Sequence, residues 1–211
     1  SKKINLFYET SDQKINFLNF NENKNNLMHT FENNKVKEIL LKEIKKKKIK
    51  IIQKKITKLT DLDTYDLQVL CLGKSSQIYQ NIINTRSIDK DYKEIAFTGR
   101  VKHNLKNVIT SQFFLKEGPL AILPFSKNNF SFVWSVKKNI IKKNIKSIIR
   151  SKICEILKVD KQINITSVQS YPLTLNLKRT YYKSNALILG EGLHTIHPVA
   201  GQGFNLVLRD I

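Results

Sequence analysis

The strongest constraint on the fold lies near the end of the sequence, where a short apolar run leads through a loop into a helical pattern. The run NALILG (185–190) is continuously apolar, which is typical of a central parallel strand buried on both faces. A Gly-Glu pair follows it, and Gly201, Gln202 and Gly203 come just before a helix that begins near Phe204. A buried strand, a loop and a helix in this order predict an open α/β sheet.

The same stretch carries the residues best placed to bind a ligand. In open α/β sheets, ligands bind beyond the carboxyl ends of the strands, where helices also present their N-termini. Glu191 is placed to accept hydrogen bonds from hydroxyl groups, and Gly201 and Gly203 let backbone N–H groups approach a planar or anionic ligand. From the residues alone, Glu191 as a cap of the next segment is an equal alternative. His194 and His197 lack a third ligand at a suitable spacing, so no metal site is predicted.

The first 90 residues predict an α/β layer. Residues 30–48 indicate a helix with an apolar face and lysines in its last turn. The predicted strands around this helix are 4–9, 14–20, 49–53 and 66–72.

Residues 92–136 predict an antiparallel sheet made of short segments rich in aromatic and β-branched residues. Its segments are 94–101, 108–115, 120–125 and 130–136, and the alternation in the last one predicts a large apolar face. Residues 137–158 predict an amphipathic helix with an isoleucine stripe. We favour a helix that covers the sheet; a helix lying on a membrane surface is the alternative.

The net charge of +20 raises the question of a polyanionic partner. Of the 37 basic residues only five are Arg, whereas recognition of phosphates and bases favours the planar fork of Arg. We therefore interpret the charge as a solvated lysine surface, with attraction to an anionic membrane as the alternative. Nucleic acid is not an expected partner.

Two further features bear on localisation. Cys71 and Cys154 lack a CxxC spacing, which favours a reducing compartment. No apolar run approaches the roughly 18 residues that cross a bilayer, and the start lacks the pattern of a signal peptide. The sequence predicts a cytoplasmic protein, with a peripheral position on the inner membrane as an extension of that prediction.

The stretch GEGLHTIHPVAGQGFNLVLRD resembles the second flavin-binding motif of the class A flavoprotein monooxygenases, the para-hydroxybenzoate hydroxylase-like enzymes. The ubiquinone-biosynthesis hydroxylases are the most similar branch. The likeness extends to GPLAILPFSKNNFSFVWSV, SYPLTLNLKRTYYKSNALILG and ENNKVKEIL, and so covers most of the chain.

This resemblance implies a mixed α/β fold that is part of an FAD-binding, Rossmann-like three-layer domain with an inserted antiparallel substrate-binding sheet. Residues 1–90 and 160–211 would form the partial FAD-binding domain, and residues 91–159 the substrate-binding sheet with its covering helix. The cofactor-binding residues that it implies are Gly190, Glu191, Pro198, Gly201, Gln202, Gly203 and Asn205. No catalytic residue is predicted.

The implied function is FAD-dependent hydroxylation of the aromatic ring of a prenylated phenol in ubiquinone biosynthesis, with NAD(P)H as reductant and O2 as co-substrate. The apolar side of the sheet at 108–136 would face that substrate. The alternative is a non-catalytic protein derived from the family, which binds a lipid or a partner in a quinone-biosynthesis assembly.

The sequence also departs from the family pattern. It has no Gly-x-Gly-x-x-Gly turn, and we expect an incomplete chain that is inactive alone. In the middle motif Leu72 replaces an Asp and Tyr79 stands where Arg is usual, although Gly73 and Ser76 remain. Lys35 replaces the Arg of the Glu-Asn-Arg helix.

Overall fold

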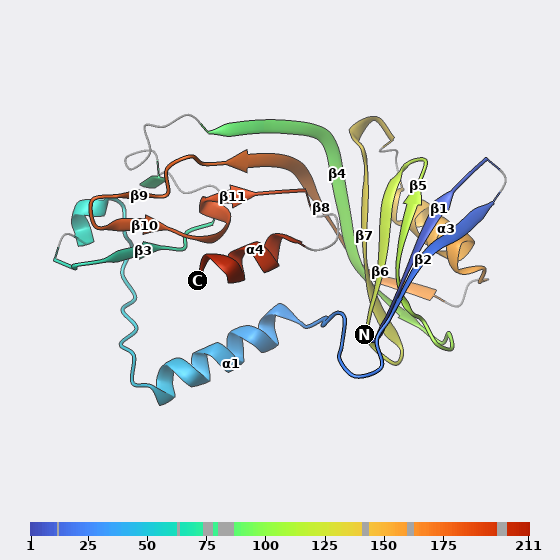
Figure 1. Cartoon of the computed structure of the whole chain (residues 1–211), viewed down its shortest axis with the longest axis horizontal. Helices are drawn as coiled ribbons and strands as arrows, with labels where there is room; N and C mark the ends of the chain where they lie inside the picture. The colour runs from blue at the N-terminus through green and yellow to red at the C-terminus, as the bar shows by residue number, and fades with distance from the viewer. Residues whose placement is uncertain are drawn as a thin grey trace. The chain divides into compact units, whose positions relative to one another are not determined.

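A computed structural model of the chain describes residues 1–11, 13–62, 64–73, 78–79, 87–140, 144–159, 163–197 and 202–211, without the side chains of residues 59, 62 and 140 (Figure 1). The chain divides into two compact units. Unit 1 comprises Ser1–Ile49 and Glu94–Pro172, and unit 2 comprises Lys50–Lys93 and Leu173–Ile211. Strands β4 and β8 run from one unit into the other.

The larger sheet has eight strands in the order β11-β8-β4-β7-β6-β5-β1-β2. Their bounds are Lys3–Glu9 (β1), Lys14–Asn21 (β2), Ile88–His103 (β4), Thr110–Leu115 (β5), Gly118–Ser126 (β6), Asn129–Lys137 (β7), Ile163–Leu177 (β8) and His194–Thr195 (β11). Strands β4 to β7 pair antiparallel, whereas β1 pairs parallel with β5. The antiparallel sheet predicted for residues 92–136 is confirmed by β4 to β7, and the complete sheet is mixed because β1 joins it in parallel.

The core of unit 1 lies between this sheet and helix α3 (Ile145–Leu157), which follows a short 3-10 turn, η2 (Lys138–Ile140). Ile149 and Ile153 of the helix are fully buried in one cluster with Phe130, Phe132 and Trp134 of β7. This packing confirms that the predicted isoleucine stripe covers the sheet. It also corrects the proposed substrate face, because the large apolar side of β7 is filled by the helix.

The opposite face of the sheet carries smaller side chains. Ser131 and Val133 of β7 and Ala121 and Leu123 of β6 alternate with the buried residues and are half-buried. Since a strand turns successive side chains to opposite faces, these residues share the side that α3 does not cover. A ligand of the sheet in unit 1 would meet this face.

Two other predictions for the first 90 residues are wrong. Strands β1 and β2 form one end of the large sheet, where β1 pairs with β5, and they are not part of a separate α/β layer. Residues 49–53 form no strand, and Ile51 and Ile52 are more than half exposed. The first error concerns a strand whose partner lies far away in the sequence, and the second an apolar segment that stays exposed. That residues 1–90 and 160–211 form a partial FAD-binding domain stays a prediction.

Helix α1 (Asn33–Lys46) confirms the helix predicted within residues 30–48. None of its residues is fully buried, and Ile39 and Leu40 are exposed. An ion pair of 3.2 Å joins Glu32, which precedes the helix, to Arg100 of β4. No helix in the described parts of the chain is both long and apolar enough to cross a membrane.

Unit 2 contains a three-stranded sheet in the order β3-β10-β9. Its strands are Gln68–Leu70 (β3), Tyr182–Lys183 (β9) and Ala186–Ile188 (β10), and its helical elements are Leu59–Leu62 (η1), Gly190–Gly192 (η3) and Gln202–Asp210 (α4). The run at 185–190 is thus the central strand, parallel to β3, as the sequence predicted. Together, the two sheets and their helices confirm the mixed α/β class.

Candidate functional site

Two segments that lie far apart in the sequence meet at the carboxyl ends of β3 and β10. These strands pair in parallel, with Leu70 opposite Ile188. The pairing continues past the strands, because the Leu189 N–H donates to the Leu70 carbonyl oxygen over 3.1 Å. Residues 71–73, which follow β3, therefore lie beside the glycine turn that follows β10, at the strand ends where ligands bind in open α/β sheets.

Tyr79 joins the two segments. Its hydroxyl oxygen accepts the backbone N–H of Leu72 over 3.0 Å. A Cβ atom on Gly192 would lie 2.3 Å from that oxygen, so only glycine fits there. Burial of Tyr79 raises the pKa of its phenol, and the hydrogen bond from the Leu72 N–H opposes this shift only in part. The sequence marked Tyr79 only as a departure from Arg, and its buried position gives it a packing role.

Gly190 begins the turn η3 with a backbone that favours glycine. Its φ angle is +72°, which places it in the left-handed region. Its N–H donates to the Asp210 carboxylate over 3.0 Å, and the methyl groups of Val207 lie 3.6 and 3.7 Å from the position of an added Cβ. The glycine thus lets the turn lie against helix α4.

His194 completes the contact between this turn and the helix. Its Nε2 lies 2.9 Å from both carboxylate oxygens of Asp210, and each side chain is only 14% exposed. Because an ionised carboxylate only accepts, this ring nitrogen must be the donor. The sequence analysis missed Asp210. One signal was available: a carboxylate in the last turn of a helix faces the negative end of the helix dipole, which is unfavourable without a partner.

The remaining predicted residues are divided between the turn and the helix. Glu191 is exposed in η3, and its carbonyl oxygen accepts the Thr195 hydroxyl over 3.4 Å. Gln202 and Asn205 are exposed in the first turns of α4, and an added Cβ on Gly203 would have no neighbour within 4 Å. Pro198, Gly201 and Ser76 lie outside the described residues.

This arrangement fits a cofactor that carries hydroxyl groups and a planar or anionic part. The open backbone beside Gly203 lets a flat group approach the first turn of a helix, whose N–H groups favour negative charge. Glu191 offers an exposed carboxylate for hydroxyl groups. Elsewhere in unit 2, the His197 ring makes an edge contact with Tyr92 at 5.2 Å. No group of three or more metal-binding side chains occurs among the residues that the structure describes.

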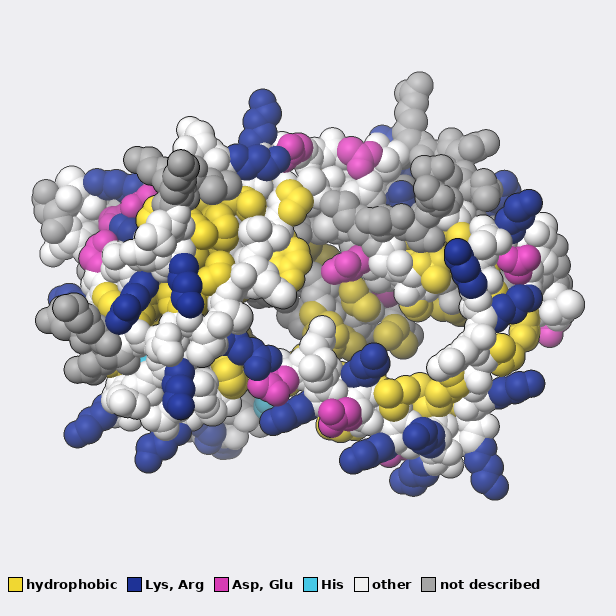
Figure 2. All heavy atoms as spheres, turned by 180° about the vertical axis from the view of Figure 1, so that it is seen from behind, with side chains coloured by type: hydrophobic (Ala, Val, Ile, Leu, Met, Phe, Trp, Pro, Cys, Tyr) yellow, Lys and Arg dark blue, Asp and Glu magenta, His cyan; other side chains and the backbone are white. Residues whose placement is uncertain are grey.

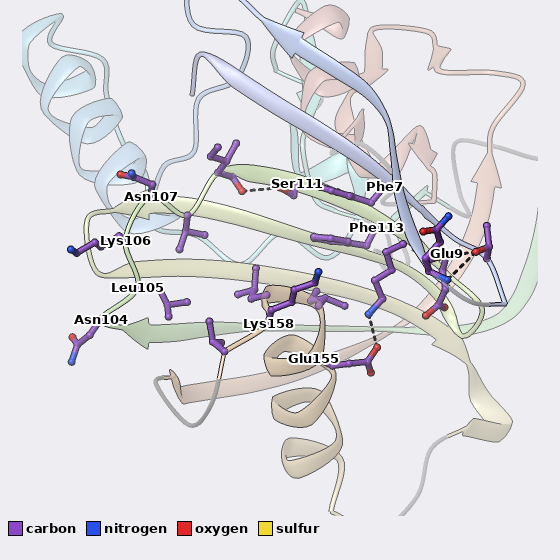
Figure 3. A pocket seen from close by; sticks show the side chains of 18 of the residues that line it. Phe7, Glu9, Asn104, Leu105, Lys106, Asn107, Ser111, Phe113, Glu155 and Lys158 are labelled. Carbon is purple, nitrogen blue, oxygen red and sulfur yellow. Dashed lines mark hydrogen bonds and ion pairs between the residues drawn. The ribbon is translucent and has the colours of Figure 1, made fainter.

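A separate hollow of about 1050 Å³ lies in unit 1 (Figure 3). It is formed by β1, the following turn, the loop at 104–109 and the end of α3, and the stacked rings of Phe7 and Phe113 line it. The Lys14–Glu155 ion pair crosses it, as the dashed line in Figure 3 shows. None of the predicted cofactor-binding residues lines this hollow, so it is not the site that the motif predicts.

On the face of the molecule drawn in Figure 2, the basic side chains are dispersed. Figure 2 shows Lys and Arg over many elements of the face in view, without an uninterrupted cluster, and apolar side chains at the surface of α1. This distribution agrees with the solvated lysine surface inferred from the composition.

The fold is shared with solved flavin-dependent enzymes. The flavin-dependent halogenase CmlS superposes with a TM-score of 0.72 at 12% identity, over 99% of this chain and 44% of that one. Aklavinone-11 hydroxylase, solved with FAD and aklavinone, superposes with a TM-score of 0.51 at 10% identity, over 65% of this chain and 28% of that one. The fold of the described chain is thus that of flavin-dependent halogenases and monooxygenases.

Sequence relatives point to one branch. The chain is 28% identical to ubiquinone hydroxylase UbiL of Rhodospirillum rubrum, over 66% of this chain and 34% of the relative. It is 27% identical to the mitochondrial ubiquinone biosynthesis monooxygenase COQ6 of Schizosaccharomyces pombe, over 49% and 30%. For the 3-demethoxyubiquinol 3-hydroxylase of Escherichia coli the identity is 32%, over 48% and 27%. No family model matches the chain.

These relatives confirm the resemblance to the ubiquinone-biosynthesis hydroxylases. The matched part of the chain spans about a third of the length of each of these curated relatives. In unit 2, the candidate site lies where two segments of the chain leave the carboxyl ends of the parallel strands β3 and β10.

Proposed function

We propose that this chain is part of an FAD-dependent monooxygenase that hydroxylates the aromatic ring of a prenylated phenol in ubiquinone biosynthesis. One observation carries the proposal. The turn after β10 and the first turns of α4 present an exposed carboxylate and open glycine backbone, in a sequence that resembles a flavin-binding motif. The relatives named as ubiquinone hydroxylases support the same reaction.

In this proposal the residues of unit 2 bind the cofactor and orient it. Glu191 would hold ribityl hydroxyl groups, while Gln202, Gly203 and Asn205 would lie along the flavin ring. The positive end of α4 would stabilise negative charge on that ring. When bound, FAD that is reduced by NAD(P)H supplies the activation of O2, and the protein positions the reactants and excludes water. Pro198 and Gly201 belong to the same proposed set.

The uncovered face of the large sheet supports a prenylated substrate. Phe17, Leu18 and Phe20 of β2 are between 42% and 52% exposed, and the ring of Phe17 lies 6.1 Å from that of Phe114. An isoprenoid chain placed on these side chains would remove apolar surface from water, which stabilises binding by about 25 cal/mol per Å². We propose this face, and not the helix-covered one, as the surface for the substrate tail.

The charge of the chain supports a location close to a membrane. A prenylated phenol resides in lipid, and a net charge of +20 would attract the protein to an anionic bilayer. We therefore propose a cytoplasmic protein that binds the inner membrane peripherally, alone or within a quinone-biosynthesis assembly. Loss of binding to anionic liposomes at high salt is the expected result, and no binding at low salt would contradict this part of the proposal.

Leu72 favours a second candidate function, a non-catalytic protein that binds a lipid or a partner. Where the family pattern has an Asp, Leu72 offers no carboxylate, and its side chain is 45% exposed. The two candidates differ in cofactor uptake, because the non-catalytic protein would need neither FAD nor NAD(P)H.

The test is an assay of the full-length natural protein with NAD(P)H, O2 and a short-chain prenylated phenol. Hydroxylation consumes one NAD(P)H and one O2, adds one oxygen atom to the ring and releases the other as water. We expect a product that is heavier by one oxygen atom, formed only when FAD is present. A protein that binds the phenol but leaves it unchanged with FAD and NAD(P)H would favour the second function.

A further inference from the structure

We propose that His194 and Asp210 are positioning residues, which lock the turn Gly190–Gly192 to helix α4 and so hold the flavin-binding residues in place. This inference rests on the proposed function and deepens it, because it concerns residues that lie behind the cofactor contacts. Neither side chain was among the cofactor-binding residues predicted from the sequence.

The Asp210 carboxylate holds the turn against helix α4 through its hydrogen bonds to Gly190 and His194, and we call this arrangement the clamp. One carboxylate accepts two donors, the Gly190 N–H over 3.0 Å and the His194 Nε2 over 2.9 Å. The two donors precede Asp210 by 20 and 16 residues, so the carboxylate closes the whole glycine-rich segment into a loop. Both side chains are largely shielded from solvent, which strengthens hydrogen bonds to a carboxylate.

Helix α4 depends on this clamp more than a buried helix would. It has nine residues and none of them is fully buried, and an isolated helix of that length is unstable in water. Phe204 and Leu208 are exposed, whereas Val207 and Asp210 contact the turn. The contacts in the second half of the helix therefore fix the direction of its first half.

The first half of α4 carries Gln202, Gly203 and Asn205, which we propose to lie along the flavin ring. Because a helix is stiff over nine residues, a shift at Asp210 moves these residues as well. Displacements of about 1 Å at a reacting centre are enough to lower a rate about a hundredfold. A break in the clamp should thus weaken cofactor binding although neither clamp residue is among the proposed cofactor contacts.

The test uses the full-length natural protein and four variants. Asp210→Ala removes the acceptor, His194→Leu removes one donor, and His194→Gln restores a donor at that position. Asp66→Asn is the matched control, because Asp66 is an exposed carboxylate of the same unit. The measurements are the Kd for FAD, the visible spectrum of the bound flavin, the unfolding midpoint, and amide exchange around residue 190 without FAD.

We expect Asp210→Ala to weaken FAD binding about ten- to a hundredfold, the effect of losing hydrogen bonds to a charged group. Amide exchange at Gly190 should accelerate even without FAD. His194→Leu should shift the flavin spectrum and weaken binding, while His194→Gln and Asp66→Asn should stay close to the wild-type protein.

The outcomes separate the two proposals. A wild-type protein that takes up no FAD overturns the proposed function together with this inference. A wild-type protein that binds FAD, with an unchanged Kd in Asp210→Ala, overturns the inference alone. A merely structural role would lower the unfolding midpoint of His194→Leu and His194→Gln equally and leave the flavin spectrum unchanged, which would also contradict the inference.

Discussion

Units 1 and 2 bury their apolar residues to different extents. In unit 1 a helix closes one side of a broad sheet, and Trp134, Phe130 and Phe132 are almost completely inaccessible to water. Among the described residues of unit 2, the buried cluster has five members and includes Ile188 and Tyr79. This difference indicates that unit 1 supplies most of the stability of the fold, whereas unit 2 carries the candidate binding site. The sheet supplies a rigid scaffold, whereas the candidate site is held by a few hydrogen bonds and close contacts.

The largest effect should come from the core of unit 1. Phe132→Ala removes a fully buried ring that lies beneath α3, and we expect a loss of about 3–5 kcal/mol in the free energy of unfolding. Chemical denaturation followed by tryptophan fluorescence measures it. Val69→Ala, at a residue of β3 that is 48% exposed, should cost less than about 1 kcal/mol. Equal losses of stability at the two positions would contradict the inference that unit 1 contains the more deeply buried core.

The next largest loss of stability should come from a side chain added where the backbone is crowded. At Gly118, φ is +132° and an added Cβ would lie 2.0 Å from the Ser135 carbonyl oxygen, so Gly118→Ala should destabilise unit 1 by about 1–3 kcal/mol. Gly203→Ala is the counterpart in unit 2, where the space is open, and should change stability by less than about 1 kcal/mol. Thermal unfolding of both variants measures the contrast, which a destabilised Gly203→Ala would contradict.

Removal of the Tyr79 hydroxyl group tests how far one hydrogen bond stabilises unit 2. Tyr79→Phe leaves the Leu72 N–H without its acceptor and should lower the stability of this unit by about 1–2 kcal/mol. Amide exchange should report the change at residues 68–73 and 186–193, and leave the exchange in β5 to β7 unaltered. Tyr171→Phe, at an exposed tyrosine of β8 in unit 1, is the control. A uniform change over the whole chain would show that the units do not open separately.

The smallest effect concerns pH. Burial lowers the pKa of His103 below its ordinary value of 6.5, because the charged ring is poorly solvated beside Phe130. The unfolded chain then binds more protons below pH 6.5, so unit 1 should lose stability as the pH falls from there. His103→Phe should abolish this slope, whereas His29→Gln, at an exposed residue, should keep it. An unchanged slope in His103→Phe would refute the assignment.

Local patterns predicted much of the fold. The alternation at 130–136, the stripe at 145–156 and the apolar run at 185–190 each indicated an element that the structure contains. The errors are non-local. The pairing of β1 with β5 joins residues more than 100 positions apart, and no local pattern reports such a contact. Likewise, the large apolar face of β7 could have met a ligand or a helix, and only the packing of α3 decides between them.

The candidate site was predictable to a similar extent. Gly190 marked the turn because its left-handed backbone favours glycine, and Gly203 marked the helix start, where the structure leaves open space beside the backbone. Asp210 was not singled out and the packing role of Tyr79 was not predicted, since an acid at a helix end and a tyrosine after a short strand are common in any chain. Their roles follow from partners 20 and 7 residues away, which the three-dimensional structure supplies.

The most direct test of the central claim, that unit 2 carries part of a flavin site, is a titration of the full-length natural protein with FAD, followed by visible absorption and flavin fluorescence. We predict saturable binding that yields a yellow protein, and affinity that falls in Gly203→Val, where a branched side chain would occupy the open space at the start of α4. A protein that stays colourless with excess FAD, or one that binds FAD equally well in Gly203→Val, would contradict it.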